Sequence, residues 1–84
     1  MSELGPNAPV FPGWVMDRSV GGVGLWSEKQ ILEGTQLRVR PDHAPAMTPW
    51  VEVEVRTCNE HEGGWRLHCA FVKTPPYTVL LLFG

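Results

Sequence analysis

Asp17-Arg18-Ser19-Val20-Gly21-Gly22 reads D-x-S-x-x-G and lies between two apolar stretches, residues 14–16 and residues 23–26. A short run of Asp, Ser and Gly between apolar stretches is typical of two strands joined by a turn. Asp and Ser side chains can hydrogen-bond nearby backbone or the edge of a ligand, while glycines permit positive φ and the close approach of a bound group. The same residues also fit a hairpin corner in which Asp17 and Ser19 bond only their own turn amides. The motif alone therefore leaves a binding role and a structural role open.

Further strands are expected downstream, at residues 36–40, 50–58 and 65–72. Their alternation of apolar and polar residues predicts strands with one face on a core and the other in water. The polar segment 59–64 ends in two glycines and predicts an antiparallel hairpin with a loop longer than the tightest type. The residues expected to face the core are Leu37, Val39, Val51, Val53, Val55, Trp65, Leu67, Cys69 and Phe71.

In this order of strands, with D-x-S-x-x-G followed by Gly24-Leu25 and by a closing Cys-x-Phe strand at residues 69–71, the chain resembles the PilZ domain family. The resemblance covers residues 14–72. It implies a small antiparallel β-barrel that serves as a receptor module for the bacterial second messenger cyclic di-GMP and passes the signal to another protein. In that family an upstream R-x-x-x-R motif supplies two arginines, and the D-x-S-x-x-G turn contacts the guanine part of the ligand. Asp17, Ser19 and Gly22 match the turn motif, whereas residues 1–16 contain no Arg or Lys.

The missing arginines matter because the ligand carries two phosphate charges and two flat guanines. A guanidinium group forms bidentate hydrogen bonds with phosphate or with the O6 and N7 edge of guanine, and it stacks on the base. Arg18 is the cation nearest to the motif in sequence, although strand alternation directs it away from Asp17 and Ser19. The expected ligand contacts are the side chains of Asp17 and Ser19, the backbone of Gly21 and Gly22, and Arg18 as the most available cation.

The alternative function is a PilZ-like interaction module that binds no ligand and docks a partner protein. Its basis is the missing arginine pair together with the apolar segment 79–83. An exposed apolar patch of that size is uncommon on a monomer, so this segment is expected to pack on the barrel or on a partner. Thr74-Pro75-Pro76 resembles a helix start with Thr74 as the cap, so residues 77–83 are expected to form either a short helix or a strand.

Length and composition predict one all-β domain over residues 1–84, with an irregular segment at residues 1–12. Nine glycines and eight prolines fall mostly between the apolar runs, as a chain with many turns requires. Residues 41–49 contain three prolines and are expected to form a loop between strands. A chain of this size has too little room for an enzyme cleft with a cofactor fold, so neither catalysis nor a cofactor is expected.

The net charge of −2 argues against binding of nucleic acid or of an anionic membrane through a broad electrostatic surface. The longest apolar run, residues 79–83, is far shorter than the roughly 20 residues of a membrane span, and residues 1–12 do not resemble a signal peptide, so a cytoplasmic location is expected. Four arginines lie on outward faces of the expected strands. They could form a basic stripe that binds single-stranded nucleic acid, or they could belong to a solvent-exposed barrel wall in which they pair with Glu52 and Glu54. The negative total charge favours the wall. These arginines are Arg38, Arg40, Arg56 and Arg66.

Cys58, His61, His68 and Cys69 lie within twelve residues, but Cys58-x-x-His61 has no second pair at the spacing of a zinc site. No metal is therefore expected. If neither strand carries a bulge, Cys58 and Cys69 point to opposite sides of the sheet and cannot form a disulfide. His68 stands where the PilZ family often has a glycine, which is expected to change the wall near a ligand.

Overall fold

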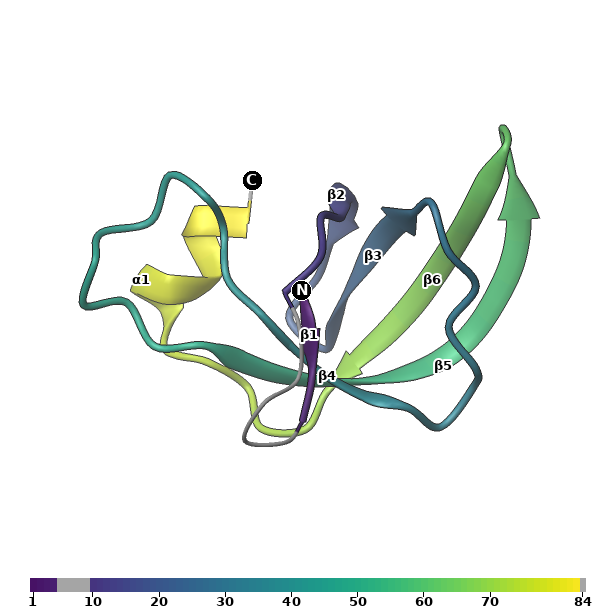
Figure 1. The fold of residues 1–84 in the computed structure, drawn as a ribbon. Helices are drawn as coiled ribbons and strands as arrows, with labels where there is room; N and C mark the ends of the chain where they lie inside the picture. Colours follow the sequence, from purple (N-terminus) through teal and green to yellow (C-terminus); the bar gives the residue numbers. More distant parts are fainter. Residues whose placement is uncertain (5–9, 84) are drawn as a thin grey trace.

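The computed structural model describes residues 1–4 and 10–83, which fold into one antiparallel sheet with a short helical segment after it (Figure 1). The sheet order is β1-β4-β5-β6-β3-β2, so strands distant in sequence become neighbours at β3 and β6. The all-β class expected from the sequence is confirmed. The elements are β1 (Ser2–Glu3), β2 (Trp14–Arg18), β3 (Gly22–Ser27), β4 (Gln36–Val39), β5 (Val51–His61), β6 (Gly64–Phe71), α1 (Tyr77–Leu80) and the 3-10 helix η1 (Leu81–Phe83).

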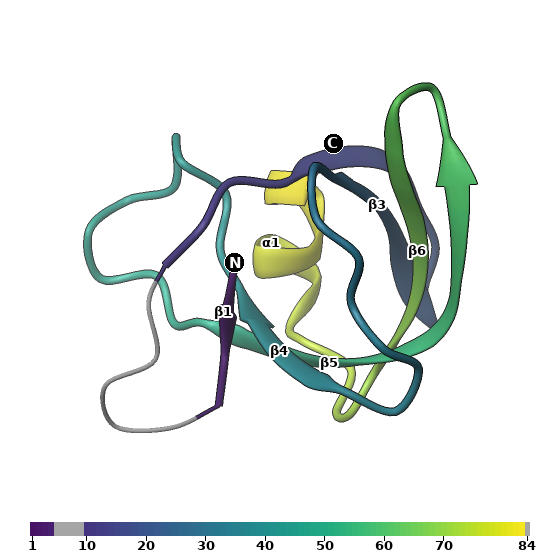
Figure 2. The ribbon, with the colours of Figure 1, turned by 45° about the vertical axis from the view of Figure 1, so that its right-hand side comes forward.

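The sheet is strongly curved, and its two ends are tied together near the N-terminus (Figures 1 and 2). Ser2 of β1 forms an antiparallel bridge with Val10, and Met1 and Phe11 exchange two backbone hydrogen bonds of 2.6 and 2.7 Å. The segment that carries Val10 and Phe11 runs on into β2, the opposite edge of the sheet. The expected irregular segment at residues 1–12 therefore contains a short strand, and its residues 5–9 lie outside the described part of the chain.

The core fills the concave side of the sheet. The expected inward faces of the three downstream strands are confirmed, with Trp65 and Phe71 half-buried against the core and the other inward residues buried. Val23 and Leu25 of β3 complete this face. Burying one aliphatic side chain of this kind stabilises a fold by about 1.5–3 kcal/mol. The alternation of Val, Leu and polar residues in the sequence therefore determines which side of the sheet is dry.

The helical segment at the C-terminus covers one end of this core, on the concave side of the sheet (Figure 2). Leu80 and Phe83 are buried and Val79 is half-buried, so the apolar segment packs on the barrel. Thr74 does not cap the helix: the N-cap is Pro76, which has no side-chain capping bond. Residues 41–49 form the expected loop. None of the described helices has the length and apolar character needed to cross a membrane.

The hairpin between β5 and β6 is tighter than the sequence indicates. β5 continues to His61 and β6 begins at Gly64, so the turn consists of Glu62 and Gly63, whose φ angles are 49° and 80°. Two central residues with positive φ are the mark of a type I′ turn, which matches the twist of paired strands. The expected longer loop is wrong because the polar residues 59–61 continue the strand in a hairpin that projects beyond the rest of the sheet (Figure 1).

A β-bulge in β5 changes the prediction for the cysteines. Val55 pairs with Cys69 and Thr57 with His68, so Arg56 is the extra residue and Cys58 comes to lie opposite Leu67. Directly opposed residues in an antiparallel pair share a face, so Cys58 and Cys69 lie on the same, inner face. Both remain free thiols. Burial, followed by the charge of Cys58, raises the pKa of the Cys69 thiol from 9.0 to about 12.

We expect Glu62→Asn to stabilise the protein by about 0.5–1 kcal/mol, because Asn adopts a positive φ more readily than Glu and Asn-Gly is a preferred type I′ pair. Thermal unfolding measures the change. Glu60→Asn, which removes a carboxylate from the neighbouring strand without touching the turn, is the control and is expected to gain no stability. A Glu62→Asn protein that melts no higher than Glu60→Asn would contradict the turn assignment.

Because the pKa of Cys69 is raised, the stability of the protein is expected to change with pH in the alkaline range. Below pH 9.0, the pKa of the thiol in the unfolded chain, Cys69 is protonated in both states and its contribution to stability is complete. As the pH rises from 9.0 toward about 12, the unfolded chain loses this proton first, and the free energy of unfolding falls by up to about 1.4 kcal/mol per pH unit. Urea unfolding of the wild type and of Cys69→Val is expected to show the wild type losing stability relative to the variant above about pH 9. If the free energy of unfolding varied with pH in the same way in both proteins, Cys69 would ionise equally well in the folded and the unfolded state, which would contradict the prediction.

Candidate functional site

The D-x-S-x-x-G motif forms the corner between β2 and β3, as expected from its flanking strands. The Ser19 N–H donates to the Gly22 carbonyl at 2.9 Å and closes the turn. The Gly21 carbonyl accepts a hydrogen bond of 3.0 Å from the Phe71 N–H, at the end of β6. The corner is thus fixed on two sides, by its own closing bond and by the neighbouring strand.

A shallow depression of about 240 Å³ lies beside this corner. Four of the five expected site residues line it, namely Asp17, Ser19, Gly21 and Gly22. The opposite wall comes from β5 and β6, through Arg56, His68, Cys69 and Ala70. The structure therefore brings the motif together with residues that lie roughly forty to fifty positions later in the chain.

Arg18 does not line the depression. It pairs directly with Val23, a buried residue of the inner face, so Arg18 lies on the inner side of edge strand β2. Strand alternation had already directed it away from Asp17 and Ser19. The cations beside the motif come instead from β5 and β6.

Arg66 is the first of these cations. Its Nη2 contacts the Asp17 Oδ2 at 2.7 Å, and the two side chains are 34% and 56% exposed. In the register of the sheet Asp17 lies opposite Gly24, so the ion pair spans β3 above this glycine. A Cβ on Gly24 would lie 2.6 Å from the Asp17 Oδ1, so the missing side chain provides the space for the carboxylate. The pair gives the Asp17 carboxylate a neighbouring cation, which favours its charged form.

Arg56 is the second cation, and a bulge directs it. As the extra residue of β5 it leaves the regular alternation, and it lines the depression together with His68. Its side chain is 65% exposed and its Nη2 lies 3.5 Å from Glu54 Oε1, a solvated contact of the kind that contributes little to stability. A second bulge, with Met16 as the extra residue, lies between Val15 and Asp17 and moves the Asp17 side chain to the outer face.

The two glycines of the motif differ in role. Neither has a positive φ, so the turn does not use the left-handed conformation that glycine permits. A Cβ on Gly22 would overlap the backbone carbonyl of Cys69, whereas a Cβ on Gly21 would meet nothing within 4 Å. Gly22 therefore permits the contact between β3 and β6, while Gly21 leaves open space at the depression.

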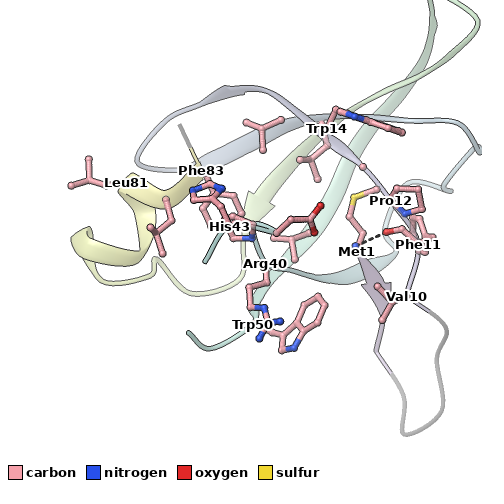
Figure 3. Close-up of a pocket in the computed structure, with 17 residues that line it drawn as sticks. Met1, Val10, Phe11, Pro12, Trp14, Arg40, His43, Trp50, Leu81 and Phe83 are labelled. Carbon is pink, nitrogen blue, oxygen red and sulfur yellow. Dashed lines mark hydrogen bonds between the residues drawn. The ribbon is translucent and has the colours of Figure 1, made fainter. Parts of the chain in front are cut away.

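A larger pocket, of about 950 Å³, lies at the end of the barrel near the C-terminus (Figure 3). Apolar side chains such as Phe11 and Phe83 form its walls, and Arg40, His43 and Trp50 lie on one side of it. The guanidinium groups of Arg38 and Arg40 lie 5.7 and 5.1 Å from the centre of the Trp50 ring.

The four outward arginines therefore divide into two groups, Arg38 and Arg40 around Trp50, and Arg56 and Arg66 beside the motif. A continuous basic stripe is not formed among the described residues. Within the same part of the chain, no group of three or more His, Cys, Asp or Glu side chains has the arrangement of a metal site.

Comparison of the chain with protein-family models, with curated proteins and with solved structures found no match in any of the three.

The contrast between the two motif glycines can be measured. We expect Gly22→Ala to destabilise the protein by about 1–3 kcal/mol, because the added methyl group overlaps the backbone of β6. The matched control, Gly21→Ala, is expected to leave stability within about 0.5 kcal/mol of the wild type or slightly above it. Urea unfolding gives both values, and equal effects at the two positions would contradict the assigned roles.

Proposed function

We propose that this protein is a PilZ-like signalling module that binds cyclic di-GMP in the depression beside the D-x-S-x-x-G corner. The observation that carries the proposal is the convergence of Asp17, Ser19 and the two motif glycines with Arg56 and Arg66. This set combines acceptors for the donor edge of guanine with cations for phosphate. The resemblance of residues 14–72 to the PilZ family supports the same ligand.

Each group has a chemical task in this proposal. The Asp17 carboxylate and the Ser19 hydroxyl accept hydrogen bonds from guanine N1–H and N2–H, which adenine does not offer in the same arrangement. Arg56 and Arg66 provide the charge that the family's upstream arginine pair supplies elsewhere. The ion pair with Asp17 involves Arg66 Nη2, and the guanidinium has further N–H donors for phosphate oxygens or for the O6 and N7 edge.

The size of the depression indicates how the ligand lies. At about 240 Å³ it is smaller than the 300–1,000 Å³ of most ligand pockets, so it encloses one part of a dinucleotide. The rest of the ligand then lies across the outer face of β2, β3 and β6. A ligand that remains half-exposed is accessible to a second protein, as a receptor that relays a signal requires. The proposed setting is the bacterial cytoplasm, and the proposed activity is non-enzymatic.

The second candidate function is an interaction module that docks a partner protein without any ligand. The observation that favours it is the 950 Å³ pocket with its apolar walls at the end of the barrel. Leu81 of the adjoining helical segment lines this pocket and is exposed. The buried part of the C-terminal apolar segment already packs on the barrel, so this candidate depends on the pocket rather than on the segment alone.

Isothermal calorimetry with cyclic di-GMP tests the first proposal. We expect micromolar or tighter binding by the wild type, weakened about tenfold or more in Asp17→Ala, Arg56→Gln and Arg66→Gln, because each change removes a charge-assisted hydrogen bond of about 1.5–3 kcal/mol. Arg18→Gln is the matched control, since it removes the same charge from the inner face, and it is expected to bind like the wild type. The absence of heat with the wild type would overturn the ligand proposal and favour the interaction module.

A further inference from the structure

Two tryptophans lie on the same outer face as the Asp17–Arg66 ion pair. Trp14 of β2 pairs with Trp26 of β3, and Trp26 pairs with Arg66 of β6, so the three residues form one row across the sheet. The adjacent row begins with Asp17, Gly24 and His68. The Arg66 guanidinium reaches across β3 to Asp17 and thereby links the two rows.

The ring of Trp26 is fixed on this outer face by two contacts. Its ring lies over Gly64, where a Cβ would overlap the Cζ2 of the indole. Its Nε1 donates a hydrogen bond of 2.8 Å to the His61 carbonyl. The contact over Gly64 and the hydrogen bond both involve the Nε1 edge of the indole, and together they fix the orientation of the ring.

Trp14 is oriented by Trp26 but is not covered by it. The two ring centroids lie 5.3 Å apart at an angle of 63°, an edge-to-face contact. Trp14 nevertheless remains 49% exposed on the edge strand. In Figure 3 its ring points away from Arg40 and Trp50 of the large pocket. A large aromatic ring is thus held in a defined orientation and left open to solvent, next to groups that suit the edge of a base.

We propose that Trp14 is the surface on which one guanine of cyclic di-GMP stacks, with Arg66 and Asp17 contacting the ligand beside it. This inference rests on the proposed function and assigns it a binding residue outside the D-x-S-x-x-G motif. An indole face binds a flat base by stacking, and a guanidinium group also offers a flat face and N–H donors to a base or a phosphate. Trp14 thereby compensates for part of the stacking that the absent upstream arginines would provide.

The glycines of the outer face are consistent with this role. Gly24 makes room for the Asp17 carboxylate and Gly64 makes room for the Trp26 ring, so both groups lie close to the sheet rather than standing away from it. A side chain at Gly24 would displace the Asp17 carboxylate, and one at Gly64 would displace the Trp26 ring. The Asp17 carboxylate and the Trp26 ring therefore leave the space above this part of the sheet open beside Trp14.

The test compares cyclic di-GMP binding by the full chain and by Trp14 variants, using calorimetry and quenching of tryptophan fluorescence. Trp14→Leu and Trp14→Val both remove the ring while keeping an apolar residue on the edge strand, so the result does not depend on the folding of a single variant. We expect each to weaken binding about 5- to 150-fold, the range for one stacked base, and to reduce the quenching caused by the ligand. Trp14→Phe, which keeps an aromatic face, is expected to retain most of the affinity.

Trp50→Leu is the matched control, because it removes an indole at the large pocket and is expected to leave the affinity unchanged. Wild-type affinity in Trp14→Leu or Trp14→Val would overturn the stacking role while leaving the proposed function intact. Lack of binding by the wild type would overturn the proposed function, and this inference with it. A loss of affinity in Trp50→Leu equal to that in the Trp14 variants would also contradict the assignment, since it would place the base elsewhere.

Discussion

The pairing of β6 with β3 on one side and β5 on the other is the constraint on which the rest of the structure depends. β6 joins the two halves of the sheet, and its Leu67 is fully buried between Leu25 and Cys58. A shift of one residue in this register would move Leu67 to solvent and Arg66 to the core, at the cost of several kcal/mol of lost burial. Because the apolar face fixes the register, it also fixes Arg66 and His68 on the outer face. The core therefore positions the candidate site without containing any of its charged groups.

The regular parts of this fold follow from sequence alternation, and the bulged parts do not. Val53 and Leu67 belong to runs with period two, which predict a buried face directly. At Met16 and Arg56 one extra residue shifts the period, and no local feature of the sequence marks either position. The same shift explains why Cys58 faces the core. Sequence reasoning identified the turn motif but not its cationic partners, because those partners depend on long-range register and on a bulge.

The Asp17–Arg66 ion pair affects the candidate site more than it affects the stability of the fold. Exposed ion pairs of this kind contribute about 0–1 kcal/mol to stability, so the pair does not explain why the sheet forms. Its effect is local, since it keeps a carboxylate on the outer face without leaving an isolated negative charge beside the proposed anionic ligand. From the sequence alone, Arg18 was expected to be the most available cation at this site. The cation comes from a strand 49 residues away in sequence, which only the sheet order brings near.

Trp14 belongs to two places at once, the row beside Asp17 and the rim of the large pocket. A molecule in that pocket and a base on the indole would therefore both lie next to Trp14, although the ring itself points away from Arg40 and Trp50. Any shift of Trp14 that one of them favours changes the free energy of binding the other, and thermodynamic linkage makes the change equal in both directions. A partner protein that prefers the ligand-bound orientation of Trp14 would tighten ligand binding by the same factor by which the ligand tightens the complex. One half-exposed ring on an edge strand is thus sufficient, in principle, to connect a signal with its recipient.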